Sequence, residues 1–199
     1  DQAYALAQLA PEQLAGLLLP LGALDKAATR ARAARLGLSV AAKTESQDIC
    51  FVEGGDYRDI LARVAPGAMA PGEIRTASGE LLGAHAGIAN YTVGQRRGLP
   101  ANLGEGPRYV TRIDPATSTI VVGREDELGA GELVADEVNL IRPERFTGGD
   151  GARVLAMTRY RQTPVPARAV LGGDGTMTVR FDAPHAAIAP GQLVALFDP

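Results

Sequence analysis

The hydrophobic pattern of the chain changes near Pro71, and this change limits the folds that the sequence can adopt. Up to residue 65, apolar residues recur at the spacing of helix turns. After residue 71, short runs of β-forming residues alternate with turn residues. The sequence therefore predicts an α+β fold, in which a helical part is followed by a small β-rich central domain and a C-terminal β-barrel. Alternating β-α units are not expected in the second part.

Three helices are predicted in the first part, over residues 11–19, 26–36 and 56–64. The second has the clearest ends, because Asp25 is a favourable N-cap and Gly37 is a favourable residue just beyond a helix. Asp56 is the predicted N-cap of the third helix, which Pro66 stops. These helices make up a predicted first domain over residues 1–65.

Two β-rich domains are predicted to follow, over residues 66–130 and 131–199, with the acidic, glycine-containing stretch 125–135 at their boundary. Segments 108–113 and 119–123 flank a turn and are typical of one hairpin. Further strands of a small barrel or sandwich are predicted over residues 152–160, 165–171, 177–181 and 193–197.

The net charge of the chain is −3, which argues against a protein that binds nucleic acid indiscriminately. Four arginines nevertheless lie within sixteen residues and have no acidic residue among them: Arg153, Arg159, Arg161 and Arg168. Such a local basic patch would suit a folded RNA. Alternation along the predicted strand puts Arg153, Arg159 and Arg161 on one face and Tyr160 on the other. The alternative is an ordinary solvated strand face.

Two further observations concern compartment and metal binding. No apolar run approaches the roughly 20 residues of a membrane-spanning helix. A single cysteine is compatible with a reducing compartment, so we predict a cytoplasmic protein. His85 has no second histidine nearby, so no metal site is predicted. His85 is instead expected to be a packed or hydrogen-bonded loop residue.

Cys50 is the only cysteine and lies in the run Glu45-Ser46-Gln47-Asp48-Ile49-Cys50-Phe51. A lone cysteine can form neither an intramolecular disulfide nor a Cys-based zinc site, so Cys50 is either an inert buried thiol or a reactive one. The residues alone favour the buried thiol. A nearby cation would raise its thiolate fraction, and Lys43 and Arg96 are the candidates.

Five segments resemble, in the same order, segments of one enzyme family. They are residues 1–4 (Asp-Gln-Ala-Tyr), 43–52 around Cys50, 83–99 with Gly-x-His-x-Gly and Tyr-Thr-Val-Gly-Gln-Arg-Arg-Gly-Leu, 159–162 (Arg-Tyr-Arg-Gln), and 184–192 with Pro-x-x-Ala-x-x-Pro-Gly-Gln. The family is that of the tRNA-specific 2-thiouridylases (MnmA/TrmU). The segment around Cys50 resembles the loop that carries the second catalytic cysteine of this family.

The resemblance implies a reaction and a set of site residues. The intact enzyme would use ATP and Mg²⁺ to activate the C2 oxygen of the wobble uridine of tRNA. Sulfur carried as a persulfide on Cys50 would then attack the C2 carbon of this uridine. A sulfur-relay protein or a cysteine desulfurase would load Cys50, and a second cysteine would help to release the thiolated base. The resemblance assigns tRNA contacts to Asp1, Gln2, Arg159, Tyr160 and Gln192, and possible active-site support to Lys43, Gln95 and Arg96.

The chain also departs from the family. The Ser-Gly-Gly-x-Asp-Ser loop that opens the ATP-binding domain of these enzymes is not found, and the Gly-Gly-Asp-Gly runs at 148–151 and 172–175 lack its serines and are typical of turns. The first catalytic cysteine is not found either. We therefore expect the C-terminal part of such an enzyme, which binds no ATP or Mg²⁺ and is inactive alone. The rival hypothesis is a non-catalytic tRNA- or ribosome-binding β-barrel module with an inert Cys50.

Overall fold

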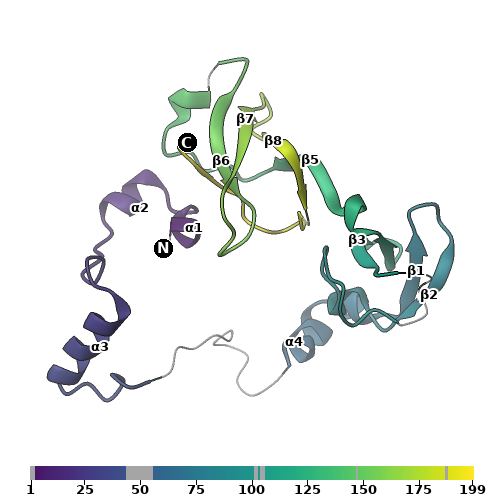
Figure 1. The fold of residues 1–199 in the computed structure, drawn as a ribbon, viewed down its shortest axis with the longest axis horizontal. Coiled ribbons are helices and arrows are strands. Elements are labelled where there is room, and N and C mark those ends of the chain that lie inside the picture. The colour runs from purple at the N-terminus through teal and green to yellow at the C-terminus, as the bar shows by residue number, and fades with distance from the viewer. Residues whose placement is uncertain (1–2, 44–55, 101–102, 104–105, 147, 187) are drawn as a thin grey trace. The chain divides into compact units, whose positions relative to one another are not determined.

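The computed structural model describes residues 3–43, 56–100, 103, 106–146, 148–186 and 188–199. The chain divides into two compact units (Figure 1). One unit is Ala10–Tyr57, and the other joins the segment that ends at Leu9 to Arg58–Pro199. The larger unit contains two β-sheets, which together with the helices make an α+β protein. The three predicted domain ranges, which divide the chain differently, stay a prediction.

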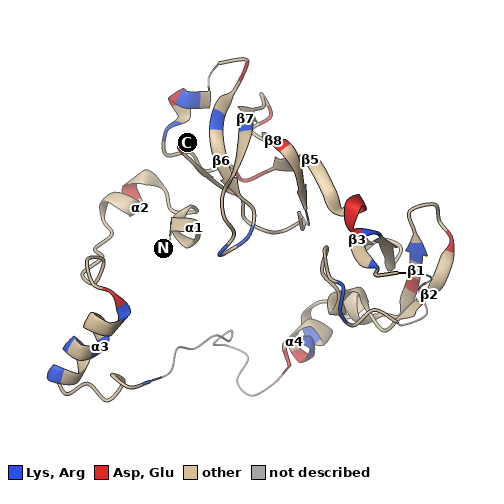
Figure 2. Cartoon of the chain, viewed as in Figure 1, with Lys and Arg blue, Asp and Glu red and all other residues tan. Residues whose placement is uncertain are grey.

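The smaller unit contains α2 (Pro11–Ala15) and α3 (Lys26–Arg35). The predicted ends of α3 are confirmed, because the carboxylate of Asp25 accepts a hydrogen bond from Ala28 N–H at 2.7 Å and Gly37 has φ of 68°. Figure 2 shows how basic α3 is. The prediction for α2 was too long, because the helix ends at Gly16, a residue with poor helix propensity.

Two helices of the larger unit precede its strands. The first, α1 (Ala3–Leu6), has only four residues. The second, α4 (Tyr57–Val64), confirms the helix predicted over residues 56–64 and is followed by the 3₁₀ helix η1 (Pro66–Met69). The α4 sequence segregates apolar residues onto one side, but none of its residues is buried in the described structure.

The first sheet has four strands: β1 (Gly72–Thr76), β2 (Leu81–His85), β3 (Tyr109–Asp114) and β4 (Thr119–Gly123). Their order is β2-β1-β4-β3, with β1 and β4 parallel and the other pairs antiparallel. The β3–β4 hairpin confirms the hairpin predicted from residues 108–123. The core of this sheet is made by Ile74, Leu103, Val110, Ile120 and Val122.

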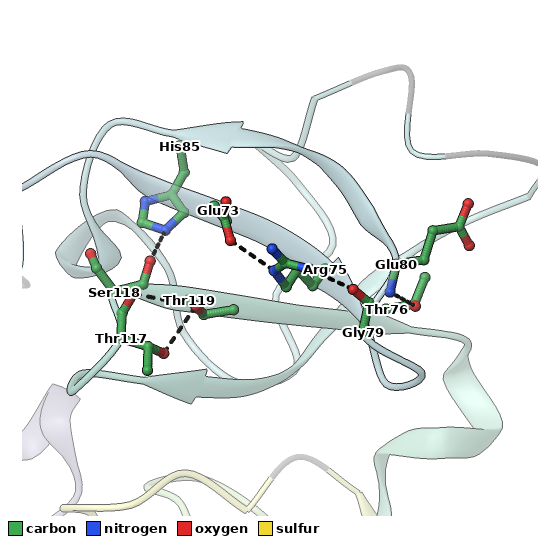
Figure 3. A network of polar contacts seen from close by, with 9 residues as sticks. All are labelled: Glu73, Arg75, Thr76, Gly79, Glu80, His85, Thr117, Ser118 and Thr119. Carbon is green, nitrogen blue, oxygen red and sulfur yellow. Dashed lines mark hydrogen bonds and ion pairs between the residues drawn. The ribbon is translucent and has the colours of Figure 1, made fainter.

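Polar contacts fix the ends of β1 and β2 (Figure 3). Gly87 N–H donates to Nδ1 of the buried His85, so Nε2 carries the ring proton and donates to the carbonyl of Ser118 at 3.0 Å. His85 is therefore hydrogen-bonded, as predicted, but it is the last residue of β2 rather than a loop residue. Gly72 lies so close to these groups that a Cβ there would collide with the Ser118 carbonyl. At the other end, Arg75 donates to the carbonyl of Gly79 in the β1–β2 turn.

The second sheet has five antiparallel strands: β5 (Gly129–Ala135), β6 (Ala152–Met157), β7 (Val165–Leu171), β8 (Met177–Ala186) and β9 (Ala195–Phe197). Their order is β5-β8-β7-β6-β9. Alternate residues of β6, β7 and β8 are buried, and they form one core with Phe146 from the 3₁₀ helix η4 (Pro143–Phe146). This alternation is the pattern of a sheet with one covered face.

The predicted C-terminal β-barrel is not closed. Within the described residues the sheet runs from β5 at one edge to β9 at the other, and these two strands do not pair. The structure is thus an open, barrel-like sheet. The stretch 125–135 forms the 3₁₀ helix η3 (Glu125–Leu128) and then β5. Strand β6 also ends at Met157, three residues before the predicted end.

Candidate nucleic-acid interface

Residues 159–162 form a tight turn directly after β6. Gln162 N–H donates to the carbonyl of Arg159 at 3.2 Å, and Arg161 at the third position has φ of 64°. The prediction that Arg159 and Arg161 share a strand face with Arg153 was therefore wrong. The pairing of β6 with β9 stops at Met157, so the alternation of a strand does not extend into the turn.

Buried polar groups hold this turn in place. The N–H and hydroxyl of Thr158 contact Oε1 of Gln162 at 3.1 and 3.0 Å, and Nε2 of Gln162 donates to Nε2 of His185 at 3.1 Å. Thr158 is 4% exposed and His185 is 8% exposed, and His185 stacks on Phe181 with ring centres 4.6 Å apart. Burial, with a smaller contribution from the charge of Arg159, lowers the pKa of His185. A neutral imidazole is what the hydrogen bond from Gln162 requires, since Nε2 must accept.

Arg159 connects the turn to a loop of the first sheet. Its guanidinium donates to the carbonyl of Val93 at 3.1 Å, across 66 positions of sequence. Val93 lies in a second tight turn, in which Gln95 N–H donates to the carbonyl of Thr92 at 2.9 Å and Gly94 has φ of 87°. The partly buried guanidinium of Arg159 is thus engaged with protein, which the sequence did not predict.

The side chain of Gln95 organises its own loop. Its Oε1 accepts from Thr92 N–H at 3.0 Å, and its Nε2 donates to the carbonyl of Arg97 at 2.8 Å. Arg96 and Arg97 are both exposed on this loop. The loop therefore presents two cations on a backbone that Gln95 holds. Active-site support by Gln95 and Arg96 stays a prediction.

Tyr4 brings three segments together. Its hydroxyl donates to the carbonyl of Leu193 at 2.7 Å, and its ring centre lies 6.2 Å from that of Tyr160. Tyr160 is 50% exposed, and the guanidinium carbon of Arg161 lies 5.3 Å from its ring centre. Helix α1, the 159–162 turn and the segment after Gln192 thus meet at one place.

A third tight turn carries Gln192. Gln192 N–H donates to the carbonyl of Ala189 at 3.4 Å, with Pro190 at the second position and Gly191 at φ of 79° at the third. This is the arrangement of a type II turn. Three turns, 92–95, 159–162 and 189–192, therefore share one design: each ends in glutamine and has a left-handed third residue. Gln192 is exposed.

The predicted basic patch is divided in the structure. The guanidinium of Arg153 makes two contacts of 2.7 Å with the carboxylate of Asp182, and this arginine holds the pKa of Asp182 below its usual range. Arg168 donates to the backbone carbonyl of Asp150 at 2.9 Å. Arg159 and Arg161 lie apart from this pair in the 159–162 turn. Arg153 and Arg168 are therefore engaged with Asp182 and with the backbone, and the four arginines do not act as one group of free cations.

Comparison with known families gives three matches in consecutive parts of the chain. A tRNA methyl transferase HUP domain matches residues 1–54, a tRNA methyl transferase PRC-barrel domain matches residues 58–124, and an Aminomethyltransferase beta-barrel domain matches residues 130–199. The second match contains the whole first sheet, and the third contains β6 to β9.

Individual relatives match the chain from end to end. The tRNA-specific 2-thiouridylase of Roseiflexus sp. (strain RS-1) is 42% identical over 201 residues, which cover 100% of this chain and 52% of the relative. Those of Parvibaculum lavamentivorans and Acetivibrio thermocellus are 39% and 41% identical, again over 100% of this chain. The chain belongs to the tRNA-specific 2-thiouridylase family. It spans about half the length of the 2-thiouridylases that it matches.

The structure describes only some of the site residues that the 2-thiouridylase resemblance assigns. Cys50, Asp1 and Gln2 lie outside the described residues. Lys43 is exposed in the smaller compact unit. Of the described tRNA contacts, Tyr160 and Gln192 are exposed and Arg159 is partly buried. The role of each stays a prediction.

Sequence reasoning missed four participants in the contacts of this candidate interface. Tyr4 and Gln162 are the last residues of segments that resemble the family. Their presence in these segments is the signal from which they could have been found. His185 occupies an unspecified position of its segment, and Val93 takes part only through its backbone carbonyl. Neither has a signal in a single sequence.

Proposed function

We propose that the protein containing this chain transfers sulfur to C2 of the wobble uridine of tRNA, which makes it a tRNA-uridine 2-sulfurtransferase. Relatives that carry the name tRNA-specific 2-thiouridylase match the chain over its full length, which supports this activity. The structural observation that carries the proposal is the meeting of Tyr4, the 159–162 turn and the segment after Gln192. Tyr4 and the turn lie in segments that resemble the family, and Leu193 directly follows a third such segment.

The meeting point has the chemistry of an RNA-binding surface. Tyr160 is half exposed, so a base or ribose can pack against its ring. Arg161 beside the ring supplies a cation for phosphate, Arg159 adds a second positive charge in the same turn, and Gln192 offers an amide that can both donate and accept. The net charge of −3 suits a partner recognised by its shape rather than nucleic acid in general. A target base would have to leave its stack to be modified.

Cys50 is proposed to carry the sulfur. A thiolate is the form of cysteine that takes up sulfane sulfur, so the loaded residue would be a persulfide. Its terminal sulfur would form the new bond to C2 as the activated C2 oxygen leaves with AMP. The thiolate of a second cysteine would then attack the Cys50 sulfur and break the S–S bond, which frees the thiolated base and leaves a disulfide. A cysteine desulfurase or a sulfur-relay protein is the proposed donor, and a cytoplasmic location agrees with a reduced thiol. In the described residues no helix is both long and apolar enough to cross a membrane.

ATP and Mg²⁺ are proposed for the intact enzyme. Within the described ranges, no three His, Cys, Asp or Glu side chains are grouped so that they could hold a metal ion. Every described α-helix also precedes the strands, so these residues contain no strand-loop-helix unit of the kind that cradles phosphate. The described residues therefore do not form a binding site for ATP or for Mg²⁺. We propose that both are bound elsewhere in the enzyme.

The test uses the complete polypeptide as the cell makes it. Cys50→Ser should abolish 2-thiouridine formation, measured by mass spectrometry of tRNA nucleosides, while tRNA affinity stays near that of the parent because the RNA contacts lie elsewhere. Ser78→Ala, in the exposed β1–β2 turn, is the matched control and should retain activity. Substantial product from the serine variant would refute the role of Cys50. A Cys50 thiol that is unreactive near neutral pH would instead favour the rival binding module.

A further inference from the structure

We infer that Tyr4 is a positioning residue of the RNA-binding surface, which acts by ordering the ring of Tyr160, while its hydroxyl bond to the backbone after Gln192 keeps Tyr4 itself in place. The inference rests on the proposed function. It adds a residue that the family resemblance does not assign to RNA contact, and it explains how three segments far apart in sequence can contact the same RNA.

Tyr4 is fixed at both ends of its side chain. The hydroxyl donates to the carbonyl of Leu193 at 2.7 Å in a partly buried position, and the ring packs beside that of Tyr160 at 6.2 Å with the planes tilted by 43°. The hydrogen bond spans 189 positions of sequence. A single side chain therefore links α1 to two different turns.

The segment that carries Tyr4 depends on such contacts. A helix of four residues is too short to be stable on its own, because helix nucleation is unfavourable. Its far end is held by Asn139, whose Nδ2 donates to the carbonyls of Ala7 and Leu9 at 3.0 and 2.9 Å. Asn139, which follows β5, thus anchors the segment beside the second sheet, and Tyr4 at the other end of the segment contacts Tyr160 and Leu193.

Tyr160 is the residue whose side chain this arrangement orders most directly. Its ring is half exposed on a turn, with the Arg161 guanidinium on one neighbouring side and Tyr4 on another. An unsupported tyrosine would have to lose its side-chain freedom when RNA binds, and this ordering weakens affinity. Tyr4 orders the ring in advance, so its removal should weaken binding through Tyr160 even without any contact of its own with RNA.

The experiment is a double-mutant cycle on tRNA affinity in the complete polypeptide, measured by filter binding at one fixed salt concentration. Tyr4→Leu should weaken binding about three- to tenfold, the loss expected from freeing one ordered side chain. Tyr4→Phe keeps the ring and should recover most of the affinity. In a Tyr160→Leu background, Tyr4→Leu should cause no further loss, because its effect passes through Tyr160. Gln8→Ala, an exposed change in the same segment, is the control and should match the parent.

The outcomes separate the two proposals. No tRNA binding by the parent would overturn the proposed function and the inference with it. Binding that Tyr160→Leu weakens and neither Tyr4 variant changes would overturn the inference alone. Losses that simply add in the double variant would also overturn it, because Tyr4 would then act independently of Tyr160. If Tyr4→Leu fails to fold, Tyr4→Met, which also removes the ring, supplies the same cycle in the parent and Tyr160→Leu backgrounds.

Discussion

Gln162 offers the sharpest test of the network beneath the 159–162 turn. Its amide contacts the N–H and hydroxyl of Thr158 and donates to Nε2 of His185, and both of those residues are buried. Gln162→Ala removes all of these contacts and leaves the backbone of the turn otherwise unchanged. The substitution therefore tests the hydrogen bonds of buried polar groups rather than hydrophobic packing.

The size of the effect follows from which groups can find new partners. The Thr158 hydroxyl lies 3.0 Å from His185 Nε2, so those two groups can still satisfy each other. The Thr158 N–H loses its acceptor in a buried position, which costs about 1–3 kcal/mol, and the lost hydrogen bonds add about 1 kcal/mol net. We expect a loss of about 2–4 kcal/mol in the free energy of unfolding, or about 4–16 °C in melting temperature for a chain of this size.

The pH dependence gives a second measurement on the same network. Because the pKa of folded His185 lies below its ordinary value, the unfolded chain binds more protons near pH 6. The stability that neutral His185 contributes to the folded protein is thus complete above the ordinary histidine pKa of about 6.5. This stability declines as the pH falls below that value. Gln162→Glu places a carboxylate against Nε2 and favours the charged ring. Its stability deficit relative to the parent should shrink between pH 7.5 and 5.5.

The measurements are thermal and urea unfolding of the parent, Gln162→Ala and Gln162→Glu across this pH range. Gln192→Ala is the matched control, since Gln192 ends a turn of the same design but is exposed, and it should melt near the parent. A Gln162→Ala melting temperature equal to that of the parent would contradict the proposed network. A constant deficit of Gln162→Glu at every pH would show that His185 does not titrate against position 162.

Two further predictions concern the backbone. Gly72→Ala should destabilise the first sheet by about 3 kcal/mol or more, because a Cβ would collide with the Ser118 carbonyl; urea unfolding measures this, and Gly67→Ala, with open space around it, should behave as the parent. Asp25→Ala should weaken α3 by about 0.5–2 kcal/mol, seen as faster hydrogen exchange in its first turn, and unchanged exchange there would refute the N-cap.

The ends of α3 could be predicted from sequence because their causes are local. Asp25 binds an N–H three residues ahead, and Gly37 needs only its own backbone freedom. The same is true of the β3–β4 hairpin, whose strands are joined by a short turn. In such places the residues that determine the structure lie within a few positions of one another.

The candidate site could be predicted only in part, because its contacts are distant in sequence. Nothing in the spacing of Tyr4 and Leu193, or of Arg159 and Val93, indicates that they meet. The end of β6 was missed for a similar reason. Its alternation continues to Tyr160 in the sequence, but β9 pairs only with Leu155–Met157, and a strand needs a partner as well as a pattern.

Arg161 has a consequence for how this position can change over time. The other two turns of the same design place glycine at the left-handed third residue, whereas arginine there carries backbone strain of about 1–2 kcal/mol. Drift should therefore run towards glycine or asparagine whenever nothing selects for the guanidinium. An arginine that persists at this site across related chains would be a record of continued use, and its replacement by glycine would identify lineages in which the guanidinium has no remaining role.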